Sequence, residues 1–247
     1  MNGAHSLVQT LVNCGVDTCF ANPGTSEMHL VAALDTVKGL RPVLCLFEGV
    51  ATGAADGYGR VAGKPAATLL HLGPGLANGL ANLHNARRAA TPIVNIVGDH
   101  ATYHLQYDAL LTSDIAGFAR PVSDWIHETK SARLAAGDAA RAVQAACAAP
   151  GGIATLILSA DTAWNPAERA AQRLPDIGPA IVTADTIEDV AALISNGKKT
   201  AVLLRARALV GAGLEAAGRI HAKTGTRLLC DTFAPHAEMG AGRVQVE

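Results

Sequence analysis

The chain has 247 residues, of which 49% are hydrophobic and 17% charged, and 20 basic side chains stand against 21 acidic ones for a formal net charge of −1. This composition excludes a disordered protein and offers no charge excess that would attract nucleic acid or an anionic membrane. No apolar stretch approaches the ~20 residues of a membrane span, and we find no secretory signal at the N-terminus. The five scattered cysteines lack CxxC spacing, which predicts buried free thiols and a cytoplasmic protein.

Short apolar runs alternate with longer helical patterns over the first two thirds of the chain. Strands are expected over 16–21, 43–47, 67–72, 93–97 and 155–159. Helices are expected over 3–14, 26–37, 48–62, 76–89 and 137–148. Because the runs show little polar alternation, they fit strands buried on both faces. The pattern predicts an α/β fold with a doubly wound parallel sheet, whose functional site lies at the carboxyl ends of the strands.

This alternation stops at residues 161–179, which contain three prolines and no clear period. We therefore expect a first domain over 1–165, a linker over 166–180 and a second unit over 181–247. The second unit is expected to hold helices over 186–195 and 211–223 and strands over 200–204 and 226–230. Two parallel strands bury little core, so this unit is interpreted as the N-terminal part of a truncated α/β domain.

The second strand runs directly into Glu48, which begins a helix. A carboxylate at a helix N-terminus is favoured in its ionised form by ~0.3–1 kcal/mol. Gly49, Gly53 and Gly57 follow on one face of that helix. Each costs ~1 kcal/mol relative to alanine in a helix interior. Close approach by another backbone or by a flat ligand would compensate for this cost.

The third strand ends at His71, which has either a structural or a functional role. Gly73, Gly75 and Gly79 then give GxGxxxG spacing instead of the GxGxxG of a dinucleotide site, so a Rossmann cofactor site is rejected.

Two further polar patterns follow the third strand. Asn78 begins an asparagine stripe with Asn82 and Asn85, which is either a solvated face or, at Asn78, a ligand contact. His100, His104 and Asp108 are spaced as i, i+4, i+8, but without a motif such as HExxH they predict no metal site.

Four segments, in order, resemble one known domain. They are FANPGTSE at 20–27, FEGVATGAADGYGR at 47–60, GPGLANGLANLHNA at 73–86 and TPIVNIVGD at 91–99. Together they are similar to the pyrimidine-binding domain of thiamine diphosphate enzymes, in the acetolactate synthase and benzoylformate decarboxylase branch. The resemblance covers residues 1 to about 165, and the remainder is similar to the start of the central domain of this family.

The resemblance implies thiamine diphosphate as cofactor and a 2-oxo acid as substrate. Glu48 would be the catalytic acid that hydrogen-bonds a ring nitrogen of the aminopyrimidine and promotes loss of the thiazolium proton. The residues that would line the pyrimidine pocket with it are Pro23, Thr25, Pro74 and Asn78.

The same resemblance leaves the substrate open. His71, the second catalytic candidate, falls where the benzoylformate decarboxylase type carries an active-site histidine, and Thr25 falls where that type carries a substrate-contacting serine. Residues 72–74 resemble the acetolactate synthase type instead. Decarboxylation alone and carboligation are therefore both compatible with the sequence.

In this family the diphosphate and Mg²⁺ are bound by a third domain with a GDG motif, which is absent from this chain. The implied partner is the diphosphate-binding domain of another subunit, in a homodimer or homotetramer. The sequence is thus interpreted as the N-terminal part of a longer enzyme, with little activity alone. The alternatives are a non-catalytic binding module and the pyrimidine-binding subunit of a split 2-oxo acid decarboxylase. FAD binds along the central domain in some members, and too little of that domain is present here to support it.

Overall fold

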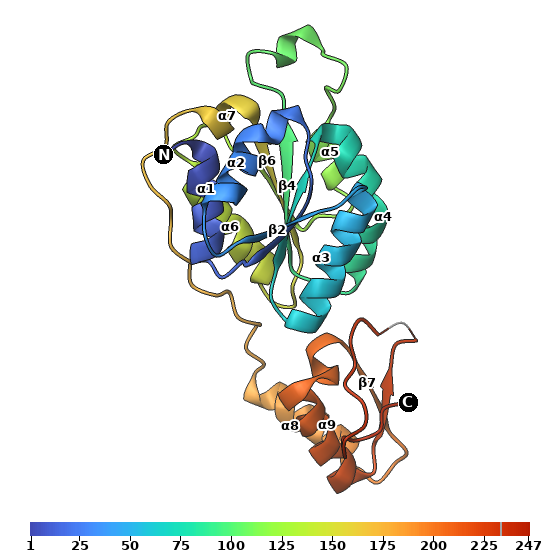
Figure 1. Ribbon diagram of the computed structural model, residues 1–247. Helices are drawn as coiled ribbons and strands as arrows, with labels where there is room; N and C mark the ends of the chain where they lie inside the picture. Colours follow the sequence, from blue (N-terminus) through green and yellow to red (C-terminus); the bar gives the residue numbers. More distant parts are fainter. Residues whose placement is uncertain (233) are drawn as a thin grey trace. The chain divides into compact units, whose positions relative to one another are not determined.

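The computed structural model describes residues 1–232 and 234–247. The chain forms two compact units, Met1–Gly178 and Pro179–Glu247, each of which combines helices with parallel strands (Figure 1). The α/β class and the doubly wound parallel sheet that the sequence predicts are confirmed in the first unit.

Six strands form the sheet of the first unit, in the order β2-β1-β3-β4-β6-β5. Every neighbouring pair is parallel. The chain passes from β1 outward to β2 and then returns across β1 to form β3, which places a topological switch point between β1 and β3. Ligands of open parallel sheets bind outside the carboxyl ends of the strands at such a point. The strands are β1 (Thr18–Asn22), β2 (Arg41–Leu44), β3 (Ala66–Leu70), β4 (Ile93–Asp99), β5 (Trp125–Glu128) and β6 (Ile153–Ser159).

Helices cover both faces of this sheet (Figure 1). One face packs against α1 (Gly3–Asn13), α2 (Met28–Thr36), α6 (Ala135–Cys147) and the short α7 (Ala160–Trp164). The other packs against α3 (Glu48–Ala62), α4 (Leu72–Arg88) and α5 (Ile115–Ala119). Because successive strand side chains point to opposite faces, Leu69 joins the first core and Leu70 the second. The continuous apolar runs in the sequence follow from this two-sided burial.

Most element boundaries differ from the sequence-based expectation by one or two residues, and two elements differ more informatively. The strand expected over 43–47 is β2, which ends at Leu44, because β2 is an edge strand and Leu44 is 71% exposed. The helix expected over 76–89 begins four residues earlier, at Leu72, within glycines and a proline that are typical of loops. β5, α5 and α7, which have four or five residues each, were not predicted.

Residues 166–178, the greater part of the expected linker, lie against α1. The Ser6 hydroxyl donates to the Arg169 carbonyl at 2.6 Å. The Ala171 N–H donates to Thr10 Oγ1 at 2.9 Å, and Asn13 Nδ2 donates to the Ala171 carbonyl at 2.8 Å. These bonds fix the segment to the first unit.

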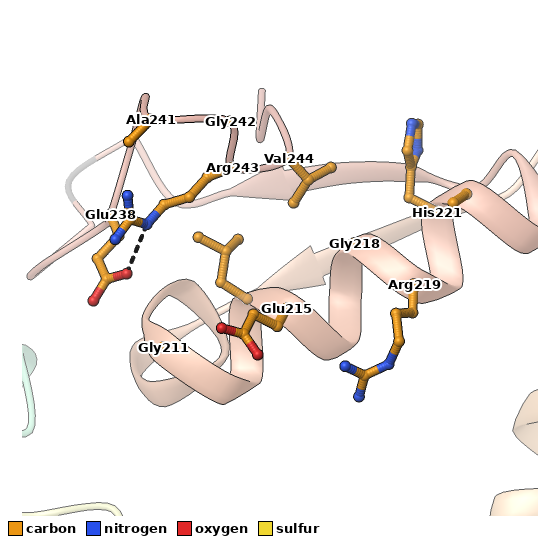
Figure 2. A pocket seen from close by; sticks show the side chains of 12 residues that line it. Gly211, Glu215, Gly218, Arg219, His221, Glu238, Ala241, Gly242, Arg243 and Val244 are labelled. Atoms are coloured by element: carbon orange, nitrogen blue, oxygen red, sulfur yellow. Dashed lines mark hydrogen bonds and ion pairs between the residues drawn. The ribbon is translucent and has the colours of Figure 1, made fainter.

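The second unit is small and contains one pair of parallel strands. Its core consists of apolar side chains such as Leu204, Leu209 and Leu228. A hollow lies along one side of α9, and the ion pair of Arg243 with Glu238 (2.9 Å) lies at its edge (Figure 2). Across the described residues, no helix has the length and apolar character needed to cross a membrane. The elements of this unit are α8 (Ala184–Ile194), β7 (Ala201–Leu204), α9 (Gly211–Thr224) and β8 (Arg227–Cys230).

The five cysteines all lie within the described residues and are reduced thiols. Cys14, Cys19 and Cys45 are buried, whereas Cys147 and Cys230 are partly exposed. Burial of the Cys19 thiol, assisted by the nearby Cys45, raises its pKa to about 12. Because only the thiolate is a strong nucleophile, burial makes Cys19 inert at neutral pH both by excluding reagents and by raising the pKa of the thiol.

In the folded chain at pH 8, we expect a disulfide reagent such as DTNB to label only Cys147 and Cys230. Cys14, Cys19 and Cys45 react after guanidinium unfolds the chain, because unfolding restores both solvent access and an ordinary thiol pKa. Counting the released thionitrobenzoate before and after denaturation checks this expectation. Rapid labelling of Cys19 in the native chain would contradict the burial described here.

Candidate functional site

Glu48 is the first residue of α3 and follows edge strand β2 through a short connection. Its residue is 9% exposed, so the carboxylate is largely removed from water. Asn78 Nδ2, from the second turn of α4, donates to Glu48 Oε2 at 3.0 Å. Among the described residues, no hydrogen bond is formed by Glu48 Oε1. The carboxylate is therefore held in place through one oxygen and can accept a hydrogen bond through the other.

Two more side-chain hydrogen bonds join α3 to α4 behind this carboxylate. Asn82 Nδ2 donates to the Gly49 carbonyl at 2.7 Å, and Thr52 Oγ1 donates to the Gly79 carbonyl at 3.1 Å. Asn78 and Asn82 therefore face α3, so the asparagine stripe is not merely a solvated surface. Such bonds tie the two helices at their N-terminal ends, where the site lies.

The three glycines that follow Glu48 have different surroundings. A Cβ atom at Gly53 would lie 2.9 Å from Asn82 Nδ2, and one at Gly49 would lie 2.4 Å from the ring of Phe47. A Cβ at Gly57 would meet nothing within 4 Å. At Gly53 the close neighbour is the Asn82 side chain of α4, not another backbone or a flat ligand, and Gly57 lies on an open surface.

His71 connects the end of β3 to α4, next to the switch point. Its Nδ1 lies 2.7 Å from Glu27 Oε2, which also accepts the Gly24 N–H at 2.7 Å. The side chain of Glu27 is 0% exposed, and that of His71 is 22% exposed. Desolvation raises the pKa of the Glu27 carboxyl, and the Gly24 N–H and His71 oppose this shift. A buried carboxyl group with a perturbed pKa, in the turn that follows a strand, is typical of functional sites.

Glu27 is the residue that sequence analysis missed. It closes the FANPGTSE segment and stands three residues after Gly24, the spacing with which an acidic side chain reaches back to the N-terminus of a turn. Only the fold places the carboxylate beneath His71, beside Gly98 of the neighbouring β4.

Gly75, in the first turn of α4, separates the two catalytic candidates. A Cβ atom at this position would lie 3.3 Å from Glu48 Oε1 and 3.5 Å from His71 Cβ. Glu48 and His71 thus flank the same piece of backbone, although they follow different strands. Of the other predicted site residues, Thr25 and Pro74 are exposed and Pro23 is half-buried. Pro23 and Thr25 follow β1, and Pro74 lies in the first turn of α4 after β3, at this edge of the sheet.

The aromatic rings after β4 contact one another in edge-on or tilted orientations. The ring centroids of His100 and His104 are 5.5 Å apart, and His104 lies 5.8 Å from Tyr107. Within residues 1–232 and 234–247, no three histidine, cysteine, aspartate or glutamate side chains are grouped so as to hold a metal ion.

The sequence and the fold were compared with those of known proteins. Residues 1–120 match the model described as "Thiamine pyrophosphate enzyme, N-terminal TPP binding domain". Residues 1–120 are thus an N-terminal domain of the thiamine pyrophosphate enzyme type. Glu48, His71 and Asn78 all fall within the matched residues.

Two individual proteins with similar sequences carry names from the same group of enzymes. The chain is 55% identical over its full length to a Mycobacterium tuberculosis protein named "Putative acetolactate synthase large subunit IlvX", of which it covers 47%. It is 30% identical over 176 residues, 70% of this chain and 33% of the relative, to the benzoylformate decarboxylase of Pseudomonas aeruginosa. The chain thus spans less than half the length of these thiamine pyrophosphate enzymes.

A solved structure shares the fold. The thiamine diphosphate-dependent 4-hydroxybenzoylformate decarboxylase of Rhodococcus jostii RHA1 superposes with a TM-score of 0.84 at 20% sequence identity. The match covers 93% of this chain and 44% of that one. The similarity extends beyond the first 120 residues into the second unit.

A substitution at Gly98 can show how tightly the buried Glu27 carboxylate is enclosed. A Cβ atom at Gly98 would lie 1.7 Å from Glu27 Oε1. We expect Gly98→Ala to lower the free energy of unfolding by about 1–3 kcal/mol, because neither β4 nor Glu27 has room to move. Urea unfolding followed by circular dichroism measures the change.

Gly57→Ala is the matched control. With nothing within 4 Å, the new methyl group meets no obstacle and leaves stability unchanged or raises it by up to ~1 kcal/mol, as alanine favours a helix. Equal unfolding midpoints for the two variants would show that Glu27 is not confined as described.

Proposed function

We propose that this chain forms the pyrimidine-binding part of a thiamine diphosphate-dependent enzyme that acts on 2-oxo acids. The single observation that carries the proposal is the Glu48 carboxylate, which is buried, oriented by Asn78 and left with one free acceptor oxygen. That arrangement suits a carboxylate that must accept a hydrogen bond from a ring nitrogen of the cofactor. When bound, thiamine diphosphate supplies the reactive carbon and the electron sink for the reaction.

The surroundings of Glu48 support this fit. Oε1 is directed toward Gly75, where the absent side chain leaves room beside the carboxylate. Asn78 contacts the carboxylate directly, and we propose that Pro23, Thr25 and Pro74 line the pyrimidine ring with it. Asn78 has a positioning role, since its amide fixes Oε2 and thereby sets the direction in which Oε1 accepts.

His71 and Thr25 would meet the substrate. Both stand beside the switch point, on the turns after β3 and β1, and His71 is only partly exposed. An imidazole there can donate to the carboxylate of a 2-oxo acid or move a proton during turnover.

The rest of the site would come from another subunit of a homodimer or homotetramer in the cytoplasm. Its diphosphate-binding domain would hold Mg²⁺ and the diphosphate. Apolar side chains surround the start of α3: Leu46 is 91% exposed, and Phe47 and Val50 are exposed as well. A cluster of this kind is typical of a surface that another protein covers.

Glu48→Gln in the full-length enzyme should lower turnover at least ~100-fold, because the amide keeps the shape of the side chain but loses the charge and basicity of the carboxylate. Glu168→Gln, at an exposed position on the segment against α1, is the matched control and should leave turnover unchanged. Steady-state kinetics with a panel of 2-oxo acids measures both variants. Near-normal turnover in Glu48→Gln would instead favour a non-catalytic binding module.

Residues 1–247 alone should not bind thiamine diphosphate with micromolar affinity, even with Mg²⁺, because they lack the diphosphate-binding domain. The full-length enzyme should bind it under the same conditions. Isothermal titration calorimetry compares the two. Micromolar binding by residues 1–247 would mean that this chain carries a complete cofactor site.

A further inference from the structure

The contact between Glu27 and His71 is not used by the proposed function, which gives roles to Glu48 and His71 but none to Glu27. The pair joins two turns that are 44 residues apart in sequence and adjacent across the switch point, through the 2.7 Å contact between Oε2 and Nδ1. The carboxylate side chain is 0% exposed and accepts one backbone N–H, from Gly24. Its second oxygen, Oε1, is buried and has no hydrogen-bond partner in the described part of the chain.

The backbone around Glu27 and His71 leaves space for their side chains. At Gly98 a Cβ atom would overlap Glu27 Oε1, and at Gly24 one would lie 2.4 Å from His71 Nδ1. Leu72, which directly follows the histidine, is fully buried yet has a φ of +53°, in the left-handed region. A non-glycine residue in this region costs of order 1–3 kcal/mol and persists where the surrounding structure enforces it. Two glycines and one strained residue thus accommodate a single carboxylate–imidazole contact.

Fold stability does not explain this arrangement. A glutamate that caps the turn at residues 25–27 could do so from the surface, where its charge would stay solvated. Burial of a carboxyl group with one unpartnered oxygen costs free energy, whereas an apolar side chain of similar volume would pack at the same place without that cost. Burial of the Glu27 carboxyl group instead fixes its contact with His71.

The contact determines which nitrogen of His71 carries the proton. An ionised carboxylate can only accept, so Nδ1 must donate and Nε2 is left with its lone pair. No hydrogen bond to Nε2 of His71 occurs among the described residues, and the side chain is partly exposed on that edge of the sheet. The imidazole is therefore held at one end and available at the other.

We propose that Glu27 is a positioning residue for His71, holding the imidazole by its Nδ1 proton so that Nε2 is presented to the 2-oxo acid. This inference rests on the proposed function, in which His71 meets the substrate. Glu27 itself touches neither substrate nor cofactor and acts only through the imidazole.

A double-mutant cycle in the full-length holoenzyme tests the proposal. Glu27→Leu, which removes the acceptor at similar size, should lower kcat per bound cofactor at least about tenfold. In a His71→Ala background the same change should have no further effect, because Glu27 acts through His71. Glu27→Gln, whose amide oxygen can still accept the Nδ1 proton, should recover most of the loss. Glu168→Leu is the control for an exposed glutamate.

The cycle separates the inference from the proposed function. If His71→Ala leaves kcat unchanged, the role of His71 in the proposed function is refuted. If His71→Ala lowers kcat while Glu27→Leu does not, or if Glu27→Leu lowers kcat equally in the His71→Ala background, the positioning role alone is refuted. Bound thiamine diphosphate per subunit is measured for every variant, so that a loss of folded protein is not counted as a loss of turnover.

A measurement on the unaltered enzyme covers the case in which Glu27→Leu fails to fold. ¹⁵N NMR of histidine-labelled holoenzyme distinguishes the two neutral tautomers, and the His71 signals are assigned by their loss in His71→Ala. We expect protonated Nδ1 and unprotonated Nε2. The opposite tautomer would overturn the proposal.

Discussion

The close approach of the first turns of α4 to their neighbours is the constraint on which the site depends. Gly73, Gly75 and Gly79 lie where a Cβ atom would meet Ser113, Glu48 and Thr52 at 2.3, 3.3 and 2.8 Å. These glycines weaken the helix intrinsically, and packing compensates for that cost. With larger residues, α4 would stand away from α3, and Asn78 could not reach Glu48. The glycine-rich turn thus brings together polar groups that follow three different strands.

The two carboxylates at this edge have different surroundings, and those surroundings suit different tasks. Glu48 borders solvent, contacts a neutral amide and keeps one oxygen available. Glu27 is enclosed, contacts an imidazole and has no route to a ligand. In the described residues neither carboxylate is paired with lysine or arginine, so no fixed cation neutralises them. Differences of this kind are how proteins give chemically identical groups separate roles.

Sequence patterns predicted a strand well where it is buried on both faces, and a helix well where its pattern is long. β4 and β6 lie between packed neighbours, and α3 begins and ends at the residues expected. Prediction failed at β5 and at the start of α4. A four-residue edge strand carries too little pattern, and the glycines and proline at 73–75 are typical of loops unless a neighbouring helix packs on them. For the site, Glu48 and His71 were predictable because both end apolar runs, whereas Glu27 was hidden in a turn.

The sequence by itself determined the alternating α/β order, the family resemblance and the strand ends at which polar side chains gather. These features are local, since each follows from the spacing of apolar, glycine and polar residues along a few turns of chain. Only the tertiary structure decided that Gly75 separates Glu48 from His71 and that Glu27 lies buried beneath His71. Such contacts depend on strand order, because β1 and β3 are neighbours in the sheet although β2 lies between them in the sequence. No local pattern records which strands become neighbours.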